Sequence, residues 1–170
     1  MSDEVLRVTE VATPLGELTV VISSQGVVAT AFDDEDPDQV VAVLEERLGT
    51  PARSAVRAMK PIRREAEAYF AGSVTTFSTP PDLRSMPEGF PRRVLEVTAT
   101  IPYGELWTYG DVAAMAGNPG AARAAGNALS RSPMELWVPC HRVVHAGRTL
   151  GGYGRHETRK RWLLKHEGAL

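Results

Sequence analysis

The sequence predicts a two-part α/β protein, with an N-terminal three-stranded antiparallel sheet and helices followed by a helical C-terminal domain. Three observations indicate this class: short β-branched segments in the first third, a stretch rich in Ser, Thr and Pro over residues 73–89, and helical periodicity after that stretch. A chain of 170 residues is long enough to form one domain or two small ones with a hydrophobic core. We place the boundary in the Pro-rich stretch, which gives domains at residues 1–80 and 81–170.

Three segments of the first domain are expected to be strands because they are rich in β-branched residues: Leu6–Val11, Glu17–Ser23 and Val27–Phe32. The turns between them are short, which predicts hairpins and hence antiparallel pairing. Asp36 followed by Pro37 is typical of a helix start, and Gly49 is expected to end that helix. A second helix is expected from near Pro61 to Gly72.

The second domain is predicted to be helical and to contain a helix-turn-helix. Apolar residues recur at helical spacing over residues 90–101. Thr108, with Asp111 three residues later, predicts a capping box and a helix that extends through Ala116. The Gly-Asn-Pro-Gly run that follows predicts a helix end at Gly117 and the immediate start of another helix, with Asn118 as its N-cap, which extends to about Arg131. Two short helices joined this tightly form a helix-turn-helix candidate.

Composition excludes several classes of protein. The chain is 24% charged and 43% hydrophobic, as is ordinary for a globular protein, and no apolar run reaches the roughly 18 residues of a membrane span. The start, Met1-Ser2-Asp3-Glu4, has no basic and apolar secretory signal, so we expect a cytoplasmic protein without membrane contact. One cysteine and four histidines offer no disulfide and no pair of thiolates for a structural zinc site, so we expect no bound metal.

Charge is distributed unevenly along the chain. Residues 1–85 carry 14 acidic and 8 basic side chains, whereas residues 86–170 carry 7 acidic and 11 basic ones. A polyanion is therefore expected to bind the second half, but a bias of this size does not by itself indicate nucleic acid.

The single cysteine lies in the sequence Pro139-Cys140-His141-Arg142, after an apolar run over residues 136–138 that predicts a short buried strand. An imidazole and a guanidinium beside a thiol can stabilise its thiolate. Because an unperturbed thiol is largely un-ionised at neutral pH, a nucleophilic cysteine needs such help. The residues alone leave two interpretations open, a nucleophile or a small buried hydrophobic side chain.

Several separated motifs resemble those of the O6-alkylguanine-DNA alkyltransferases, which move an alkyl group from guanine to their own cysteine. The active-site motif of that family is similar to residues 139–144, Pro-Cys-His-Arg-Val-Val, and the agreement is specific over residues 90–168. The other matching segments there are Ile101–Glu105, Thr108–Ala113, Ala116–Gly126, Gly151–Gly154 and Trp162–Gly168. In the first half the resemblance is looser and rests on Thr13–Gly16 and Ala68–Gly72.

The resemblance implies a ribonuclease-H-like N-terminal domain, a winged-helix-like C-terminal domain and four catalytic residues. Cys140 corresponds to the nucleophile, which forms an irreversible thioether. His141 corresponds to the histidine that activates the thiol through a water, and Glu167 to the glutamate that orients it. Tyr109 corresponds to the tyrosine that helps rotate the nucleotide and donates a proton to the departing guanine. Without the family, a structural histidine and a solvated glutamate are the commoner interpretations of His141 and Glu167.

The resemblance also implies a DNA-binding surface made of Tyr109, Ala122, Arg123, Ala124 and Gly126. In the family, an arginine of the second helix enters the base stack from which the damaged nucleotide has rotated, and Arg123 holds the matching position. That helix binds the minor groove, where alanine and glycine allow a close approach. Without the family, the alanines could equally pack into the core, and Arg123 could be an ordinary surface charge.

Four residues are expected to line the substrate pocket: Ser132, Val143, Tyr153 and Gly154. By resemblance, backbone groups of Cys140 and Val143 contact the guanine edge, and Tyr153 lies on a loop that closes over the alkyl group. Ser132 departs from the family, in which many members have an asparagine that connects the helix-turn-helix to the active-site turn. A serine offers a single hydroxyl in place of an amide, so that connection is expected to be looser.

The resemblance implies direct, stoichiometric repair of O6-alkylguanine in double-stranded DNA, approached from the minor groove, by a monomer without a cofactor. It leaves open whether molecules bind DNA cooperatively. A protein that binds and flags the lesion, like the alkyltransferase-like proteins, is the nearest rival, but these have tryptophan where this chain has Cys140. A DNA-binding regulator whose cysteine senses alkylation and a Cys-His hydrolase are two further hypotheses.

Overall fold

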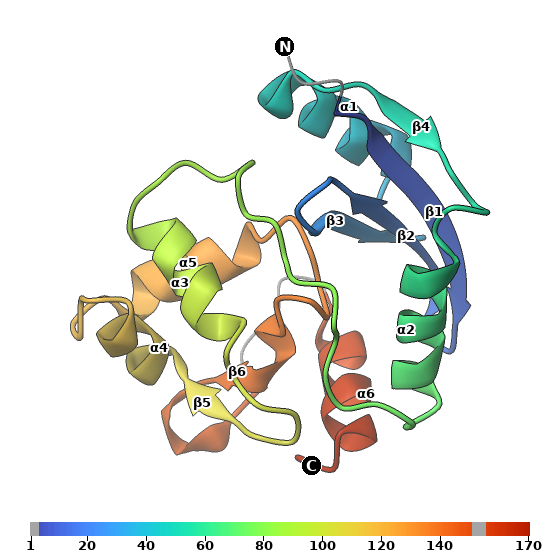
Figure 1. Cartoon of the computed structure of the whole chain (residues 1–170). Coiled ribbons are helices and arrows are strands. Elements are labelled where there is room, and N and C mark those ends of the chain that lie inside the picture. The colour runs from blue at the N-terminus through green and yellow to red at the C-terminus, as the bar shows by residue number, and fades with distance from the viewer. Residues whose placement is uncertain (1–3, 151–155) are drawn as a thin grey trace. The chain divides into compact units, whose positions relative to one another are not determined.

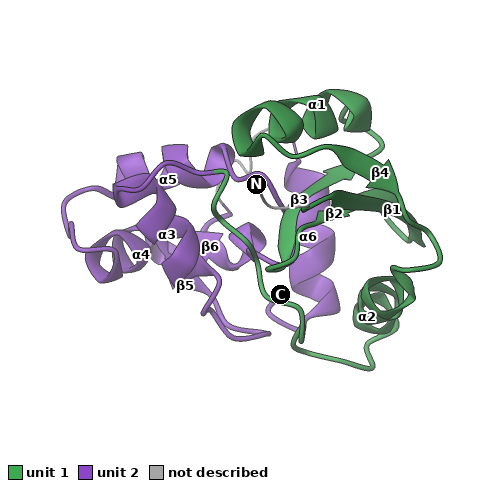
Figure 2. Ribbon diagram, turned by 45° about the horizontal axis from the view of Figure 1, so that its top comes forward, with its two compact units in different colours: residues 1–85 green, residues 86–170 purple. Residues whose placement is uncertain are grey.

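The structure, a computed structural model, describes residues 4–150 and 156–170 (Figure 1). The chain divides into two compact units, residues 1–85 and 86–170, which Figure 2 colours separately. This division lies a little after the boundary expected at residue 80, because the intervening segment still bonds to the first unit. Asp82 N donates to Val27 O at 2.7 Å, and Ser23 Oγ donates to Asp82 Oδ2 at 2.5 Å.

Four strands form the sheet of the first unit, in the order β3-β2-β1-β4. The three expected strands are present as β1 (Leu6–Thr13), β2 (Gly16–Ile22) and β3 (Val27–Phe32), and neighbours among them pair antiparallel. The sheet has one strand more than expected, because the short β4 (Ala52–Ser54) pairs parallel with β1. A strand of three residues is too short to produce a periodic apolar pattern, so the sequence held no signal for it.

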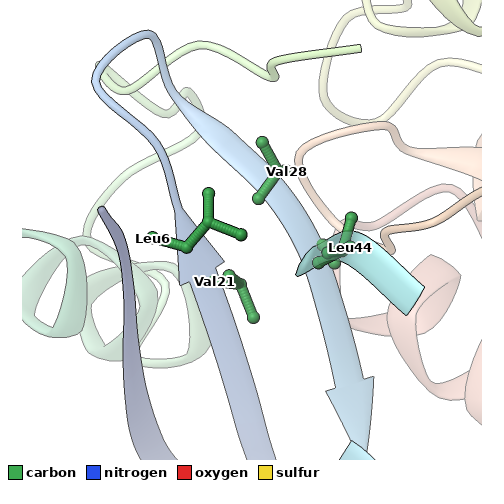
Figure 3. Packing of buried hydrophobic residues seen from close by; sticks show 5 residues of the cluster. Leu6, Val21, Val28 and Leu44 are labelled. Atoms are coloured by element: carbon green, nitrogen blue, oxygen red, sulfur yellow. The ribbon is translucent and has the colours of Figure 1, made fainter. Parts of the chain in front are cut away.

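Two helices pack against this sheet. The first, α1 (Pro37–Leu48), has the expected ends: the Asp36 side chain accepts two backbone hydrogen bonds of the first turn, and Gly49, at φ 61°, follows the last turn. Leu44 of α1 packs in a buried cluster with Leu6, Val21, Val28 and Ala29 (Figure 3). The second, α2 (Lys60–Phe70), packs against β1 and buries Ile62, Ala66 and Tyr69.

The second unit is mainly helical, so the predicted fold class is confirmed. Its helices are α3 (Phe90–Thr98), α4 (Tyr109–Met115), α5 (Ala122–Ser130) and α6 (Glu157–His166), with short 3-10 turns at η1 (Cys140–Arg142) and η2 (Ala146–Arg148). The first three pack against one another. The predicted capping box is confirmed, because Thr108 and Asp111 bond each other's backbone N–H groups at the start of α4. No helix among the described residues combines the length and apolarity needed to cross a membrane.

The second helix of the helix-turn-helix starts later than expected. The sequence predicted a helix immediately after Gly117, with Asn118 as its cap. Instead, the carbonyl of Asn118 accepts a hydrogen bond from the Ala121 N–H at 3.1 Å, so these residues form a separate turn. Because α5 begins only at Ala122, Arg123 lies in its first turn.

The chain before the cysteine is buried as expected, but it does not form the predicted strand over residues 136–138. Leu136 has a φ of 71°, in the left-handed region, so the chain bends there instead of extending. The strand lies after the cysteine: β6 (Val143–Val144) pairs parallel with β5 (Trp107–Thr108). The thiol therefore lies at the start of the tight η1 turn and not at the end of a strand.

Candidate active site

Cys140 is almost fully buried, with 4% of its surface exposed. Burial raises the pKa of its thiol to about 12, while the nearby Ser132 hydroxyl and the charge of Lys160 favour the thiolate and oppose that rise. A thiol with this pKa is neutral at neutral pH. The site therefore holds Cys140 as a thiol that needs a base before it can attack.

His141, the next residue, is fully buried and pairs with Glu167 at the end of α6. Its Nε2 lies 2.8 Å from Glu167 Oε1, which brings together residues 26 positions apart in the sequence. Burial lowers the pKa of His141. Burial alone would raise the pKa of Glu167, but hydrogen bonds from His141 and Arg142 hold it well below its usual range. At neutral pH the pair is therefore a neutral imidazole that donates from Nε2 to a carboxylate.

The other ring nitrogen of His141 is left as an acceptor. Nδ1 is buried and has no hydrogen-bond partner in the part of the chain that the structure describes. With the proton on Nε2, Nδ1 carries a lone pair and no hydrogen. This nitrogen is the group in the site that is able to accept a proton.

Arg142 holds Glu167 in place. Its Nε and Nη2 donate to the two carboxylate oxygens at 2.9 and 2.8 Å, and its Nη1 donates to the Ile101 carbonyl at 2.6 Å. The guanidinium also lies 5.7 Å from the centre of the Tyr103 ring. The sequence suggested that the charge of Arg142 could stabilise the neighbouring thiolate, but the structure directs that charge to Glu167.

Lys160 is a site residue that the sequence did not reveal. It projects from α6, has no exposed surface, and donates from Nζ to the Val143 carbonyl at 2.5 Å. Burial lowers the pKa of Lys160 to about 8, and the negative charge of an ionised Cys140 raises it. The lysine lies between two arginines, a pattern typical of a solvated helix face, so no local signal indicated its burial.

Tyr109, the first residue of α4, contacts three other segments. Its ring lies 5.8 Å from Lys160 Nζ and 5.0 Å, centre to centre, from the His145 ring. On α5, a Cβ added to Gly126 would lie 3.7 Å from the Tyr109 ring. Burial raises the pKa of the Tyr109 hydroxyl, so it keeps its proton at neutral pH.

The alanine-rich helix α5 has a buried side and an exposed side. Ala125 and Ala128 are buried, as core packing requires, whereas Ala122, Arg123 and Ala124 are exposed and Gly126 is half-buried. The residues expected to contact DNA are thus mostly on the exposed side.

The expected pocket residues are only partly described. Val143 is fully buried in β6, and Ser132 is half-buried, with its hydroxyl donating to the Met134 carbonyl at 2.8 Å. Tyr153 and Gly154 lie outside the described residues. All the described site residues belong to the second unit.

Two family models match the chain. One, described as 6-O-methylguanine DNA methyltransferase, ribonuclease-like domain, matches residues 6–83, and the other, described as the DNA binding domain of that protein, matches residues 89–169. A methylated-DNA–protein-cysteine methyltransferase of Shigella flexneri is 36% identical over 169 residues, which cover 97% of this chain and 98% of the relative. The protein of that name from Mycobacterium tuberculosis is 48% identical over 103 residues, which cover 61% of each chain.

Solved structures give the same result. A crystal structure of Mycobacterium tuberculosis O6-methylguanine methyltransferase matches with a TM-score of 0.75 at 33% identity, covering 96% of this chain and 92% of that one. A structure of Mycobacterium tuberculosis OGT in complex with DNA matches with a TM-score of 0.76, at the same identity and coverage. Because both family models and a relative aligned over almost its full length agree, the chain belongs to the O6-methylguanine-DNA methyltransferase family, the methylated-DNA–protein-cysteine methyltransferases.

Proposed function

We propose that this protein repairs DNA by moving an alkyl group from O6 of guanine to Cys140, once per molecule. The observation that carries the proposal is a buried cysteine followed in the sequence by a buried histidine that Glu167 orients, in a chain of this family. In the reaction, the Cys140 sulfur attacks the alkyl carbon, a sulfur–carbon bond forms, and the O6–carbon bond breaks. The electron pair of the broken bond stays with guanine.

The thiol proton moves to Nδ1 of His141. Glu167 accepts a hydrogen bond from Nε2–H of His141. The basic nitrogen is therefore Nδ1, which has no hydrogen-bond partner among the described residues. One water molecule between the sulfur and Nδ1 would relay the proton, as in the mechanism that the family resemblance implies. The imidazolium that results is stabilised by the Glu167 carboxylate, which Arg142 keeps ionised and fixed.

Tyr109 donates a proton to the departing guanine. A neutral guanine is a better leaving group than its anion, so a donor at this point lowers the barrier. The raised pKa of Tyr109 supports this role, because the hydroxyl is protonated at neutral pH. The contacts with Lys160, His145 and Gly126 hold the ring in position.

The lesion reaches Cys140 after rotation out of the helix, which costs a few kcal/mol in lost stacking and pairing. We propose that α5 approaches the minor groove with Ala122, Ala124 and Gly126, whose small side chains permit close contact. Arg123 then fills the space left in the base stack. Its exposure in the first turn of α5 supports this assignment, as does its lack of a hydrogen bond or ion pair within the described residues.

In the pocket, the backbone of Cys140 and Val143 contacts the guanine edge, and Ser132, Tyr153 and Gly154 surround the alkyl group. The Val143 carbonyl already accepts a hydrogen bond from Lys160, but a carbonyl has two lone pairs and can accept a second one from the base. The chemistry requires a reduced thiol, which the cytoplasm maintains, so we further propose that the protein acts there. We also propose that it acts as a monomer and needs no cofactor or metal.

A protein that only binds and flags the lesion is the second candidate. Such a protein needs no nucleophile, whereas this chain has a cysteine beside a complete base and orienting pair. The cysteine therefore favours transfer over flagging.

Intact mass spectrometry after mixing with methylated duplex DNA tests the proposal. The expected result is one added methyl group per molecule, which peptide mapping places on Cys140. Cys140→Ala should still bind the methylated duplex but gain no mass. Unchanged protein mass with the lesion intact would support flagging, and continued loss of methyl groups at unchanged protein mass would support a hydrolase.

A further inference from the structure

Most of the basic side chains of the first unit belong to one short part of it. Residues 53–64 hold five basic side chains and no acidic one, although residues 1–85 as a whole carry 14 acidic and 8 basic ones. A sixth basic residue is the strand partner of the first of these five. We call the six residues the α2 basic patch: Arg7, Arg53, Arg57, Lys60, Arg63 and Arg64. The composition of the unit, which is acidic, does not account for such a concentration of cations.

Two arginines of the patch lie side by side on the sheet. Arg7 and Arg53 are register partners in the parallel pairing of β1 with β4. Their neighbours Val8 and Ala52 pack against the buried cluster that contains Leu44 of α1. Because successive side chains of a strand point to opposite faces, both arginines project from the other face, and both are exposed. Figure 2 shows α2 on the side of the sheet opposite α1. Like charges on paired strand residues repel each other, so this pair is unfavourable without a counter-charge.

Three further cations of the patch share one side of α2 and of the turn before it. The Met59 N–H donates to the Ala55 carbonyl at 3.1 Å, so the chain already turns as a helix ahead of α2. Arg57, Lys60 and Arg64 follow one another at spacings of three and four residues, and all three are exposed. Lys60 and Arg64 form a like-charge pair four residues apart, which destabilises a helix. The local structure thus holds like charges together in the helix as well as in the sheet.

The patch has no counter-charge of its own. None of its six side chains forms a hydrogen bond or an ion pair within the part of the chain that the structure describes. Even Nε of Arg63, which is buried, has no acceptor there. Glu65, the acidic residue that follows the patch, is occupied elsewhere: it accepts hydrogen bonds from Ser78 Oγ and the Thr79 N–H, each at 3.0 Å. An anion from outside the chain is therefore needed to offset the repulsion.

We propose that the α2 basic patch binds the phosphate backbone of duplex DNA, as a contact outside the family's DNA binding domain, which matches residues 89–169. Five of its six residues are arginines, whose planar guanidinium groups donate paired hydrogen bonds to phosphate oxygens. Phosphate contacts carry no sequence information, so the patch holds undamaged and damaged duplex alike. The proposal rests on the proposed function only in taking DNA as the partner, and the chemistry at Cys140 does not enter it.

The charges favour DNA over a second copy of the chain. Residues 33–38 contain five acidic side chains, so the same segment of a second copy is the other candidate for the anion. Duplex DNA carries one negative charge per about 1.7 Å of helix axis and a layer of condensed counterions. Each cation that binds a phosphate releases such a counterion, and this gain in entropy is much smaller when the partner is a set of protein carboxylates.

The test measures binding of an unmethylated duplex by fluorescence anisotropy, from about 50 to about 200 mM salt. In the double variant Arg57→Gln/Arg64→Gln, both replaced side chains are exposed, so the fold should be retained. Each lost phosphate contact lowers the slope of log K against log salt by about 0.9, so this slope should fall by about 2. Over that salt range, the native protein should lose about 10-fold more affinity than the variant. Arg53→Gln, in β4, tests the patch from another element and should lower the slope by about 1.

Arg47→Gln/Lys165→Gln is the matched control, because it removes the same net charge at two exposed positions outside the patch. Its slope should be native. Native slopes in both patch variants, or an equal fall in the control, would overturn the proposal. So would salt-sensitive self-association that the patch variants weaken while their DNA slopes stay native, since the patch would then bind a second copy.

The proposed function is tested separately, by transfer from a free O6-methylguanine nucleoside, which has no phosphate backbone. Both patch variants should transfer at the native rate, because the patch belongs to the first unit and the described site residues belong to the second. Absence of transfer by the native protein would contradict the proposed function and leave the result for the DNA slope unchanged. Slow transfer by the patch variants alone would show that the substitutions disturb the site, and would overturn a role confined to the DNA backbone.

Discussion

Glu167→Gln tests whether the buried carboxylate orients the base. The native carboxylate accepts hydrogen bonds from His141 Nε2 at 2.8 Å and from Arg142 Nε and Nη2 at 2.9 and 2.8 Å. Glutamine has nearly the same shape, but one of its two oxygens becomes an NH₂ donor. That donor must face either His141 or Arg142, and both present N–H groups to this position in the native protein.

The cost to stability follows from the burial of the pair. Removing one charge from a buried ion pair costs about 3–5 kcal/mol, because the remaining charge is left without compensation. A chain of this size loses about 2–4 °C in Tm per kcal/mol, so the Tm of Glu167→Gln should fall by about 6–20 °C.

The effect on transfer follows from the histidine tautomer. An amide donor facing His141 turns Nε2 into an acceptor and places the proton on Nδ1, which removes the proposed base. The equivalent change in serine proteases lowers kcat by about 10⁴-fold. We therefore expect single-turnover methyl transfer by Glu167→Gln to be slower by about 100- to 10,000-fold, even at temperatures where the variant is folded.

The assay is quenched single-turnover transfer from methylated duplex, with a thermal melt of each variant. Glu157→Gln, on the exposed side of α6, is the control and should change neither quantity substantially. Native transfer rates in Glu167→Gln would refute the orienting role. A lowered Tm with a native rate would show that the pair serves stability alone.

The remaining predictions concern stability at acidic pH, base rotation, proton donation and the contact between Gly126 and Tyr109. The pKa of Glu167 is lower in the folded protein than in the unfolded chain, so its contribution to stability is fully present above about pH 4.3 and is lost as the pH falls further. On acidification, the Tm of the native protein should therefore drop more steeply than the Tm of Glu167→Gln. Arg123→Ala should slow transfer from duplex DNA by about 10- to 100-fold but leave transfer from a free O6-methylguanine nucleoside unchanged; equal losses on both substrates would contradict the stack-filling role. Tyr109→Phe keeps the ring but not the donor, so transfer should slow by about 100-fold with duplex affinity retained, and a native rate would argue against proton donation. Gly126→Ala should be tolerated, because its Cβ would lie at an ordinary contact distance of 3.7 Å from the Tyr109 ring. Gly126→Leu should displace the ring and slow transfer by about 100-fold, and single-turnover rates of the two variants test this difference.

Elements whose ends are decided by a few neighbouring residues were predictable from the sequence. Asp36 caps α1 and Thr108 caps α4, because each side chain bonds backbone groups within three residues of itself. The predicted start of α5 was wrong for a related reason. Asn118 is suited both to a helix cap and to a turn, and local sequence does not determine which of the two forms.

The catalytic residues were predictable because they lie in motifs, but their electrostatic environment was not. The apolar run before Cys140 has the same pattern whether it forms a strand or an irregular buried segment, so it gave no signal for the left-handed backbone at Leu136. Arg142 and Lys160 carry the same formal charge. Only the fold shows that the first pairs with Glu167 and that the second is buried and donates to the Val143 carbonyl.

A protein that is consumed by one reaction has opposite requirements for its thiol before and after the lesion arrives. A thiolate exposed at rest would react with any passing electrophile, and each such event would remove one molecule from repair. Burial prevents this by raising the pKa of Cys140 to about 12, so the resting sulfur is a neutral thiol. On the proposed mechanism, reactivity resides in fixed neighbours instead, with His141 accepting the proton and Glu167 stabilising the imidazolium that forms. The flipped guanine then places its alkyl carbon against the sulfur. The thiolate therefore forms only where the carbon that it attacks is already in position.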